Sequence, residues 1–429
     1  MVSELVVVMR GRRVGELKQD DRGRLALRYD SEWRAAEDST PLSLSMPLSE
    51  AEHEDQVVRA FLWGLLPDNE AVLERWAQVY QVSARNPFAL LRHVGEDCAG
   101  AAQFVTPERI EAIMAGDGGV EWIDVQEIAA RVRTLRSDPA AWNLSRSGQF
   151  SLAGAQAKTA LHYDEAADRW GDPWGVVPTT HIVKPAISGF DEHDLNEHLC
   201  LEAARGLGIV AARSRVVAFG AERVIVVERY DRQRSAVGAW LRVHQEDVCQ
   251  ALGRPPTAKY QNEGGPGPED VIGLLRRAVL TPRGADADVQ RFVDALVFNW
   301  LIGGTDAHAK NYSILLGGAG ARLAPLYDVA SALPYDDMYM PRLRMAMRIG
   351  GDYRLDGITG TRWRRLAVEA GLDPAGTVDR ARAYAQELPD VISRIAKGHE
   401  IAGLASGLPG RLAERMTARA TLCERLLDR

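Results

Sequence analysis

The hydrophobic pattern changes its period near Asp231, and this change limits the possible folds more than any other feature of the sequence. Before Asp231, short runs with strand-like alternation predict strands at 4–10, 13–18, 24–29, 159–163, 181–184, 214–219 and 223–229. After it, apolar residues recur at three- and four-residue spacing and predict helices at 269–279, 289–301, 360–369, 378–395 and 408–427, with few strands. The sequence therefore predicts an α+β chain with an α-rich second half.

Helical spacing also occurs within the first half, at 55–66, 69–80, 86–94, 124–136 and 195–207. A polar stretch with Ser and Gly at 143–148 leads into the later strands. We predict three parts. Residues 1–110 form a small β-meander with helices, 111–232 form a sheet that carries the helix at 195–207, and 233–429 form a helical lobe. Two lobes around a cleft are typical of an enzyme.

Composition excludes several classes of protein. The 429 residues are 46% hydrophobic and 26% charged, which is typical of a globular chain. A net charge of −7 argues against a dedicated nucleic-acid-binding face, so any DNA contact is expected to be indirect. No signal peptide or membrane-spanning run is found, which favours the cytoplasm and no membrane contact. The four cysteines include no CxxC pair and predict neither disulfides nor a zinc knuckle.

The run Gly303-Gly304-Thr305-Asp306-Ala307-His308-Ala309-Lys310-Asn311 carries the strongest chemical signal. Asp306 and Asn311 have the D-x-x-x-x-N spacing of a kinase catalytic loop, in which the Asp accepts the proton of the attacking hydroxyl and the Asn ligates magnesium. Asp328 follows 17 positions after Asn311, and oxygen ligands from these two residues suit Mg²⁺ bound to ATP phosphates. Each residue alone is an ordinary turn former, but together they predict phosphoryl transfer.

His308 leaves a second hypothesis open at this point. With Asp306 it offers two ligands of a metallohydrolase site, but the nine histidines are scattered and form no second cluster. We interpret His308 as a residue that shapes the catalytic loop.

A kinase also needs groups that bind the ATP phosphates. The small residues of Ser151-Leu152-Ala153-Gly154-Ala155-Gln156-Ala157-Lys158 allow backbone N–H groups to approach phosphate oxygens, although the run is not a Walker A motif. Lys184 ends an apolar strand, where kinases place the phosphate-binding lysine, and Glu197 on the next helix is its expected ion-pair partner. Lys158 is an alternative to Lys184 for the phosphate role.

The segment Glu228-Arg229-Tyr230-Asp231-Arg232 lies where the sheet-rich sequence gives way to helices. In a two-lobed kinase this junction is the hinge, whose backbone recognises the adenine edge, and we predict that role here.

Taken together, these motifs resemble the HipA protein kinases, the toxin halves of bacterial HipBA toxin–antitoxin pairs. The resemblance rests on SLAGAQAKTAL at 151–161, THIVKP at 180–185, NEHLCLEAA at 196–204, VVERYDR at 226–232, GGTDAHAKNYS at 303–313 and PLYDVASALPY at 325–335. The opening meander and helices also resemble the N-terminal subdomain of this family. The resemblance implies a protein-kinase-like two-lobed fold that uses ATP and magnesium.

The resemblance also assigns roles to residues. It implies Asp306 as the catalytic base, Asn311 and Asp328 as metal ligands, and Lys184 on the ATP phosphates. It implies that Ala153, Gly154, Ala155, Gln156, Ala157 and Lys158 form the phosphate loop, that Glu228 and Tyr230 frame the adenine beside Arg229 and Asp231, and that His308 and Lys310 lie at the nucleotide. Ser151 matches the serine that family members autophosphorylate, which ejects the phosphate loop and inactivates the kinase.

The resemblance further implies a target and a partner. The expected target is an aminoacyl-tRNA synthetase, with glutamyl-tRNA synthetase first, and the expected outcome is growth arrest and persistence. The expected partner is a HipB-type helix-turn-helix antitoxin, through which the chain contacts DNA and co-represses its operon. Val329-Ala330 follows Asp328 in place of Phe-Gly, and no A-P-E segment is found, so neither the phenylalanine switch nor the peptide-binding surface of eukaryotic kinases is expected.

Two other functions remain open on the sequence. The D-x-H-x-x-N pattern at Asp306 also matches the catalytic loop of aminoglycoside and choline-type small-molecule kinases. A catalytically dead co-repressor is the other alternative, and the intact Asp306, Asn311 and Asp328 argue against it.

Overall fold

The computed structural model describes residues 3–142, 150–187, 189–236, 238–318, 320–338 and 342–429. The polar stretch expected at 143–148 lies outside these residues. The chain divides into two compact units made of interleaved segments. The first unit contains Met1–Pro185, Val217–Thr257 and Ile314–Ala321, and the second contains Ala186–Val216, Ala258–Ser313 and Arg322–Arg429. The predicted division at residues 110 and 232 follows chain order and stays a prediction.

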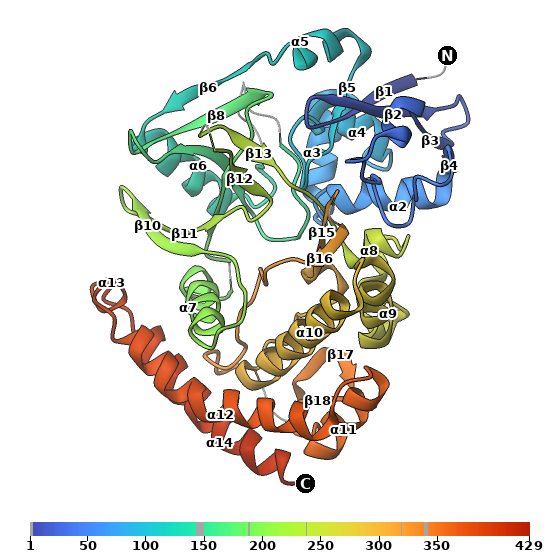
Figure 1. Cartoon of the computed structure of the whole chain (residues 1–429). Coiled ribbons are helices and arrows are strands. Elements are labelled where there is room, and N and C mark those ends of the chain that lie inside the picture. The colour runs from blue at the N-terminus through green and yellow to red at the C-terminus, as the bar shows by residue number, and fades with distance from the viewer. Residues whose placement is uncertain (1–2, 143–149, 188, 237, 319, 339–341) are drawn as a thin grey trace. The chain divides into compact units, whose positions relative to one another are not determined.

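The first unit begins with a sheet and four helices (Figure 1). Its strands are β1 (Ser3–Met9), β2 (Arg12–Gln19), β3 (Leu25–Tyr29), β4 (Glu52–Glu54) and β5 (Gln103–Val105), and its helices are α1 (Ser31–Ala35), α2 (Asp55–Leu65), α3 (Glu70–Tyr80) and α4 (Pro87–Val94). The strand order is β4-β3-β2-β1-β5, and neighbouring strands are antiparallel.

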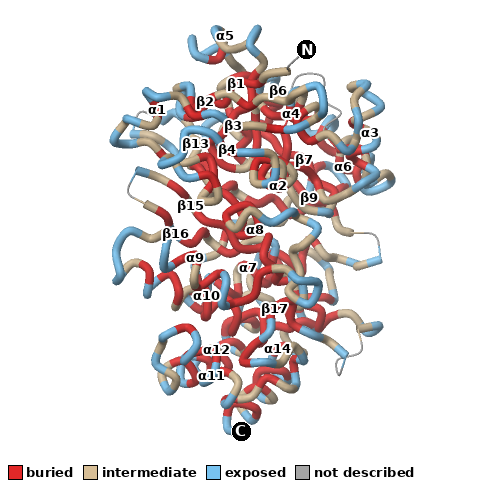
Figure 2. The backbone as a smooth tube through the Cα atoms, turned by 90° about the vertical axis from the view of Figure 1, so that its right-hand side faces the viewer, coloured by how far each residue is buried: buried red, intermediate tan, exposed pale blue. Residues whose placement is uncertain are grey.

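Both faces of β1 are buried, as its uninterrupted apolar run requires. Leu5, Val7 and Met9 join the core formed with α2, α3 and α4, whereas Val6 and Val8 pack in a separate cluster. This division follows from the two-residue period of a strand. Figure 2 shows the backbone around β1 as buried. The predicted meander and its three following helices are thus confirmed.

A second sheet of the first unit carries one helix. Its elements are η1 (Pro107–Arg109), α5 (Ile110–Met114), β6 (Gly118–Ile123), α6 (Val125–Ser137), β7 (Thr159–Asp164), β8 (Arg169–Gly175), β9 (His181–Pro185), β10 (Ser214–Phe219) and β11 (Glu222–Glu228). The strand order is β10-β11-β9-β7-β8-β6. Asp124 starts α6 with a capping box to Glu127, and Ile128 and Val132 of this helix pack against Val183 and Val226 of the sheet.

Short elements complete the first unit. They are β12 (Arg232–Arg234), β13 (Trp240–Arg242), β14 (His244–Asp247), α8 (Val248–Ala251), η2 (Pro256–Ala258), β15 (Ser313–Gly317) and β16 (Gly320–Leu323). The last residues of η2 and β16 and the first residues of β10 and β15 belong to the second unit. β12 pairs with β13, and the order β14-β15-β16 forms a three-stranded sheet. The buried carboxyl of Glu246 accepts hydrogen bonds from the Leu44 N–H and the Ser43 hydroxyl, which fixes the segment before β4 against β14.

The second unit is mainly helical. It contains α7 (His193–Gly206), η3 (Gln261–Glu263), α9 (Pro268–Ala278), α10 (Pro282–Ile302), η4 (Ala309–Asn311), β17 (Arg344–Ile349), β18 (Asp352–Arg354), α11 (Gly360–Glu369), α12 (Pro374–Ala396), α13 (His399–Ala402) and α14 (Leu408–Leu427). α12 packs along α14, and both contact α7 and α10. The buried Trp300 of α10 donates its indole N–H to the Leu355 carbonyl at 2.9 Å and lies edge-on to Trp363 of α11.

Two predictions about the elements are wrong. The helix at 195–207, found as α7, packs in the second unit against α12 and α14, and α6 covers the sheet in its place. The described part of the chain also has seven strands after Asp231, although none exceeds six residues. Among the residues described, none of the helices combines the length and the apolar character needed to cross a bilayer.

The packing of α6 on the second sheet can be tested by truncating one buried side chain. Ile128→Ala should destabilise the first unit by about 2–5 kcal/mol, because it removes buried methylenes and leaves a cavity. Val125 starts the same helix with 48% of its surface exposed, and Val125→Ala should change stability by less than about 0.5 kcal/mol. Urea unfolding would measure both variants, and equal effects would mean that α6 does not cover the sheet.

Glu246 predicts a pH dependence of stability. Burial raises the pKa of Glu246 to about 8, and the neighbouring Asp247 adds to this, whereas the bonds from Ser43 and Leu44 oppose it. The folded chain therefore keeps a proton that the unfolded chain loses near pH 4.5, so this group's contribution to stability falls as pH rises through that window.

Glu246→Gln removes the titrating group. The free energy of unfolding of this variant, minus that of the wild type, should rise by up to about 1.4 kcal/mol per pH unit between pH 5 and 8. Denaturant unfolding at several pH values would measure the difference, and parallel curves for the two proteins would contradict the assignment.

Candidate active site

The loop predicted to be catalytic begins where α10 ends. Gly303 closes the helix with φ +65°, a left-handed conformation that favours glycine. A Cβ on the next residue, Gly304, would lie 2.3 Å from Oδ1 of Asn299, so that position also excludes a side chain. The two glycines let the chain turn sharply from the helix into the loop.

Asp306 is the exposed residue of this loop. Its side chain is 70% exposed, and its Oδ1 accepts a hydrogen bond from the Tyr260 hydroxyl at 2.6 Å. Its backbone carbonyl accepts two more bonds, from the His308 N–H and from Nδ2 of Asn311, each at 2.8 Å. The loop is therefore closed on itself while the carboxylate faces outward, as a base that meets a substrate hydroxyl requires.

His308 is buried behind Asp306. Its Nε2 lies 4.0 Å from Oδ1 of Asp306, and its ring packs edge-on against Tyr260. Burial lowers the pKa of His308, partly opposed by the charges of Asp306 and Asp328, which favours a neutral ring near pH 7. In the described residues, no group of three or more His, Cys, Asp or Glu side chains gathers to hold a metal. The burial of His308 and its packing against Tyr260 support the loop-shaping role.

Asn311 and Asp328 belong to adjoining segments of the second unit. The Tyr327 hydroxyl donates to the Lys310 carbonyl at 2.6 Å, and the Ala324 N–H donates to the Ser313 carbonyl. These bonds hold the segment that carries Asp328 beside the catalytic loop. Lys310 is itself buried.

The donor set fits magnesium. The amide nitrogen of Asn311 donates to the Asp306 carbonyl, so Oδ1 is the atom that Asn311 offers to a metal, and Asp328 offers a carboxylate. Mg²⁺ prefers such hard oxygens and takes its other ligands from phosphates and water. Asp328 has φ +56°, a left-handed conformation uncommon for Asp, and such strain is often found at functional sites.

Two positioning residues were not predicted from the sequence. Asn196 of α7 donates from Nδ2 to the Ser331 carbonyl at 2.7 Å and accepts from the Ser331 N–H at 3.1 Å. The Ser331 hydroxyl in turn donates to the Ile302 carbonyl at the end of α10. Asn196 and Tyr260 thus fix the loops around Asp328 and Asp306. The sequence carried no signal for Asn196, because its burial is visible only in the structure.

In the first unit, the predicted phosphate loop is docked and partly buried. Ser151 is fully buried, its N–H donates to the Asp97 carbonyl, and its hydroxyl donates to the Leu65 carbonyl at 2.8 Å. Gly154, with φ +104°, pairs with Pro67, and Gln156 donates to the Pro185 carbonyl. The loop is a hydrogen-bonded turn whose backbone conformation at Gly154 depends on glycine.

The two candidate lysines lie at one end of a strand pair. β7 and β9 are antiparallel with Thr159 opposite Val183, so Lys158 and Lys184 lie next to this pair at the same end. Both are buried. Nζ of Lys158 donates to the Ala153 carbonyl at 2.7 Å, which ties it to the loop, and the choice between the two lysines stays open.

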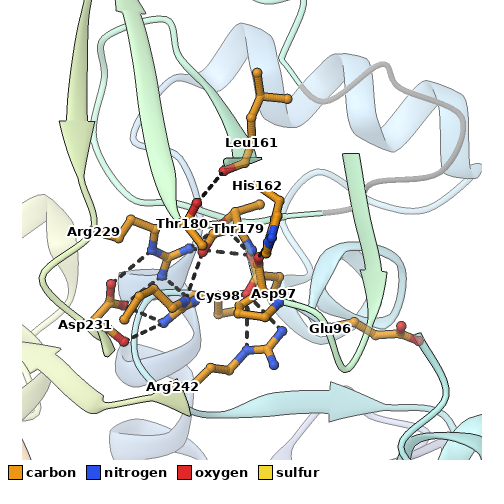
Figure 3. Close-up of polar contacts among 12 residues, drawn as sticks. Glu96, Asp97, Cys98, Leu161, His162, Thr179, Thr180, Arg229, Asp231 and Arg242 are labelled. Carbon is orange, nitrogen blue, oxygen red and sulfur yellow. Dashed lines mark hydrogen bonds and ion pairs between the residues drawn. The ribbon is translucent and has the colours of Figure 1, made fainter. Parts of the chain in front are cut away.

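The predicted hinge follows β11 directly. Glu228 and Tyr230 are partly exposed, whereas Arg229, Asp231 and Arg232 are buried. Figure 3 shows Arg229 and Asp231 pointing toward one another, in the cluster that also contains Asp97. The side chains of Arg229 and Asp231 are thus engaged in the interior, and only their backbone is available to a nucleotide.

Some of the predicted site residues are brought together within one unit and others are not. Asp306, His308, Lys310, Asn311, Asp328 and Glu197 belong to the second unit, and the phosphate loop, Lys184 and the hinge belong to the first. The predicted ion pair of Lys184 with Glu197 joins residues of different units and stays a prediction. The first unit also contains a pocket of about 510 Å³, lined by Arg92, His93, Arg109 and Trp174 among others, and none of the predicted site residues lines it.

A two-lobed α+β fold with this loop is that of a protein kinase, and comparison with known proteins agrees. The HipA N-terminal domain profile matches residues 5–105, and the HipA-like C-terminal domain profile matches residues 150–395. The chain belongs to the HipA family and is a kinase.

Relatives support this membership over the full length. The Y4mE protein of Sinorhizobium fredii, which bears the name of a kinase, is 36% identical over 414 residues, 96% of each chain. The serine/threonine-protein kinase toxin HipA of Shewanella oneidensis is 29% identical over 395 residues, covering 89% of this chain and 87% of that protein. A solved complex of Shewanella oneidensis HipA, HipB and operator DNA matches with a TM-score of 0.82 and 26% identity, covering 99% of this chain and 98% of the other.

Tyr260 gives a test of the loop geometry. Tyr260→Phe removes one hydrogen bond to Asp306, worth about 1 kcal/mol, so kcat should fall about threefold to tenfold while the KM for ATP stays within about twofold. Tyr163→Phe, which removes an exposed bond to Asp168 in the first unit, should leave kcat unchanged. Steady-state kinetics would measure both, and wild-type kcat in Tyr260→Phe would show that this bond does not orient the base.

Proposed function

We propose that the chain is an ATP-dependent serine/threonine kinase that acts as the toxin of a HipBA-like pair. The observation that carries this proposal is the closed loop in which Asn311 bonds the Asp306 carbonyl while the Asp306 carboxylate stays exposed. Full-length similarity to a kinase toxin supports it.

The proposed reaction transfers the γ-phosphoryl group of ATP to a serine or threonine hydroxyl. Asp306 accepts the hydroxyl proton as the new P–O bond forms, and the bond to the leaving ADP oxygen breaks. Tyr260 orients the Asp306 carboxylate and His308 supports the loop from behind. Asn311 and Asp328 would hold magnesium, which neutralises charge on the phosphates when bound.

The proposed nucleotide contacts in the first unit come from three segments. The loop Ala153–Lys158 offers backbone N–H groups to the phosphates, with Lys158 or Lys184 supplying the cation. Glu228 and Tyr230 frame the adenine, with Arg229 and Asp231 contributing backbone only.

We also propose autophosphorylation at Ser151. Because Ser151 is fully buried and its hydroxyl is bonded to Leu65, the residue must leave this position before it receives phosphate. A dianionic phosphate does not fit the docked site, so modification would hold the loop away from it. This supports a self-inactivating role for the modification.

The proposed partners follow from the relatives. Since the matched HipA is found in a complex with HipB and operator DNA, we propose a HipB-type antitoxin and co-repression for this chain. A net charge of −7 favours DNA contact through the antitoxin. An aminoacyl-tRNA synthetase, with glutamyl-tRNA synthetase first, is the proposed target. These partners place the proposed action in the cytoplasm, with growth arrest and persistence as its outcome.

The test is phosphorylation of the purified full-length chain by magnesium ATP. Intact mass and phosphopeptide mapping should find one phosphate on Ser151 in the wild type and none in Asp306→Asn or Ser151→Ala. Asp286→Asn, an exposed carboxylate of α10, should behave as wild type. The Ser151→Ala chain, which cannot inactivate itself, should then phosphorylate one member of a synthetase panel.

The opposite outcome is equally clear. A wild-type chain that binds ATP and modifies neither itself nor any synthetase would contradict the protein-kinase proposal. Transfer to aminoglycosides or choline would then indicate a small-molecule kinase, and antitoxin binding without any transfer would indicate an inactive co-repressor.

A further inference from the structure

A buried loop of the N-terminal region, Asp97–Gly100, forms hydrogen bonds with residues near both ends of the predicted hinge, residues 228–232. Arg229 donates to the Cys98 carbonyl at 2.9 Å, and Arg232 donates to the Gly100 carbonyl at 2.9 Å. The Gly100 N–H donates back to Oδ2 of Asp231 at 2.7 Å. Figure 3 shows Cys98, Arg229 and Asp231 meeting from separate segments of the first unit.

Asp97 is the central acceptor of this network. Its Oδ1 accepts from Arg232 at 2.9 Å and from Arg242 at 3.2 Å. Its Oδ2 accepts from the Thr179 N–H at 3.0 Å and from the Thr179 hydroxyl at 2.6 Å, and lies 3.5 Å from Nη1 of Arg229. The same Thr179 hydroxyl accepts from Arg229 at 2.7 Å. One carboxylate thus fixes three guanidinium groups.

The charges in this cluster do not cancel. Arg229, Arg232 and Arg242 bring three positive charges against two from Asp97 and Asp231, and the Arg242 side chain is only 9% exposed. Burial alone raises the pKa of Asp97, but the three guanidinium groups outweigh it and hold that pKa well below its usual range. Losing the charge of Asp97 would leave three buried cations against one carboxylate, so the arginines would have to move.

The hinge side chains alternate in direction from Glu228 to Asp231, and Arg232 also points inward. Arg229, Asp231 and Arg232 are buried in the network, whereas Glu228 and Tyr230 are partly exposed. The inward residues therefore anchor the backbone on which the two proposed adenine-framing residues stand. The anchor comes from sequence more than 130 residues earlier, in the N-terminal region.

We infer that Asp97 is a positioning residue for nucleotide binding, which acts through Arg229, Arg232 and Thr179 to fix the hinge backbone in the conformation that recognises the purine of ATP. This inference rests on the proposed function, because it takes Glu228–Asp231 as the hinge. It makes the N-terminal region part of the machinery that selects the nucleotide.

Three variants separate positioning from simple stability. Asp97→Asn removes the charge but keeps the shape and the backbone bond to Ser151. Thr179→Val removes only the hydroxyl that joins Asp97 to Arg229, and serves if Asp97→Asn does not fold. Asp172→Asn is the matched control, since it breaks a buried bidentate pair with Arg131 in the same unit, away from the hinge.

The readouts are the equilibrium Kd for ATP, by competition with a fluorescent ATP analogue, and the KM for ATP and for GTP against kcat. Asp97→Asn should raise both the Kd and the KM for ATP by about tenfold, and Thr179→Val should raise both by about threefold. In both variants kcat should stay within about twofold and the KM for GTP should not change, so selectivity for ATP over GTP falls. Asp172→Asn should lower the unfolding midpoint without changing either KM.

The outcomes also distinguish this inference from the proposed function. A wild-type chain that neither binds ATP nor transfers phosphate would overturn the proposed function. The inference alone would be overturned by a different result. In that case the wild type is active, and the folded Asp97→Asn or Thr179→Val variant keeps the wild-type Kd for ATP and the wild-type selectivity for ATP over GTP.

Discussion

The buried pairing of Asp97 and Asp231 with three arginines is the constraint on which the first unit depends. A guanidinium group has five donors and cannot be buried without acceptors. Here the acceptors are two carboxylates, the Thr179 hydroxyl and the carbonyls of the loop Asp97–Gly100. The β5 region, the end of β11 and β13 are therefore held in one mutual arrangement, which apolar packing alone, being non-directional, would not specify.

Local sequence predicted the elements well where it marks their ends. The bounds of α11 and α14 agree with the helical spacing, and the capping pair Asp124 and Glu127 marks the start of α6. β8 was missed because Gly171, Asp172 and Pro173 interrupt any alternation, and its stability comes from pairing with two neighbours. For α7, the spacing predicted an amphipathic helix but did not identify the helices that cover it, because an apolar helix face does not specify which element packs against it.

The same distinction applies to the candidate site. Asp306, Asn311 and Asp328 could be proposed as site residues because they form a motif with short spacing along the chain. Tyr260, Asn196 and Asp97 were not predicted, because each bonds a segment 46 to 135 residues away and the neighbouring sequence does not indicate that contact. The motif also assigned Arg229 and Asp231 to the nucleotide. Their side chains bond each other in the interior, so the proposed nucleotide contact falls to their backbone.

In the second unit, the proposed reactive side chain is exposed and the side chains that fix its loop are buried. Asp306 is exposed, as the proposed base must be to meet a hydroxyl, while its neighbours His308 and Asn311 are buried and packed in the loop. A buried amide with a fixed donor presents its oxygen in one direction, as the proposed metal ligand requires. The carboxylate of Asp306, the proposed base, is oriented by its bond from Tyr260. The Asp306 carboxylate and the Asn311 amide are restrained by separate bonds. A change at Tyr260 therefore disturbs the proposed base without moving the amide, whereas a change at Asn311 disturbs both.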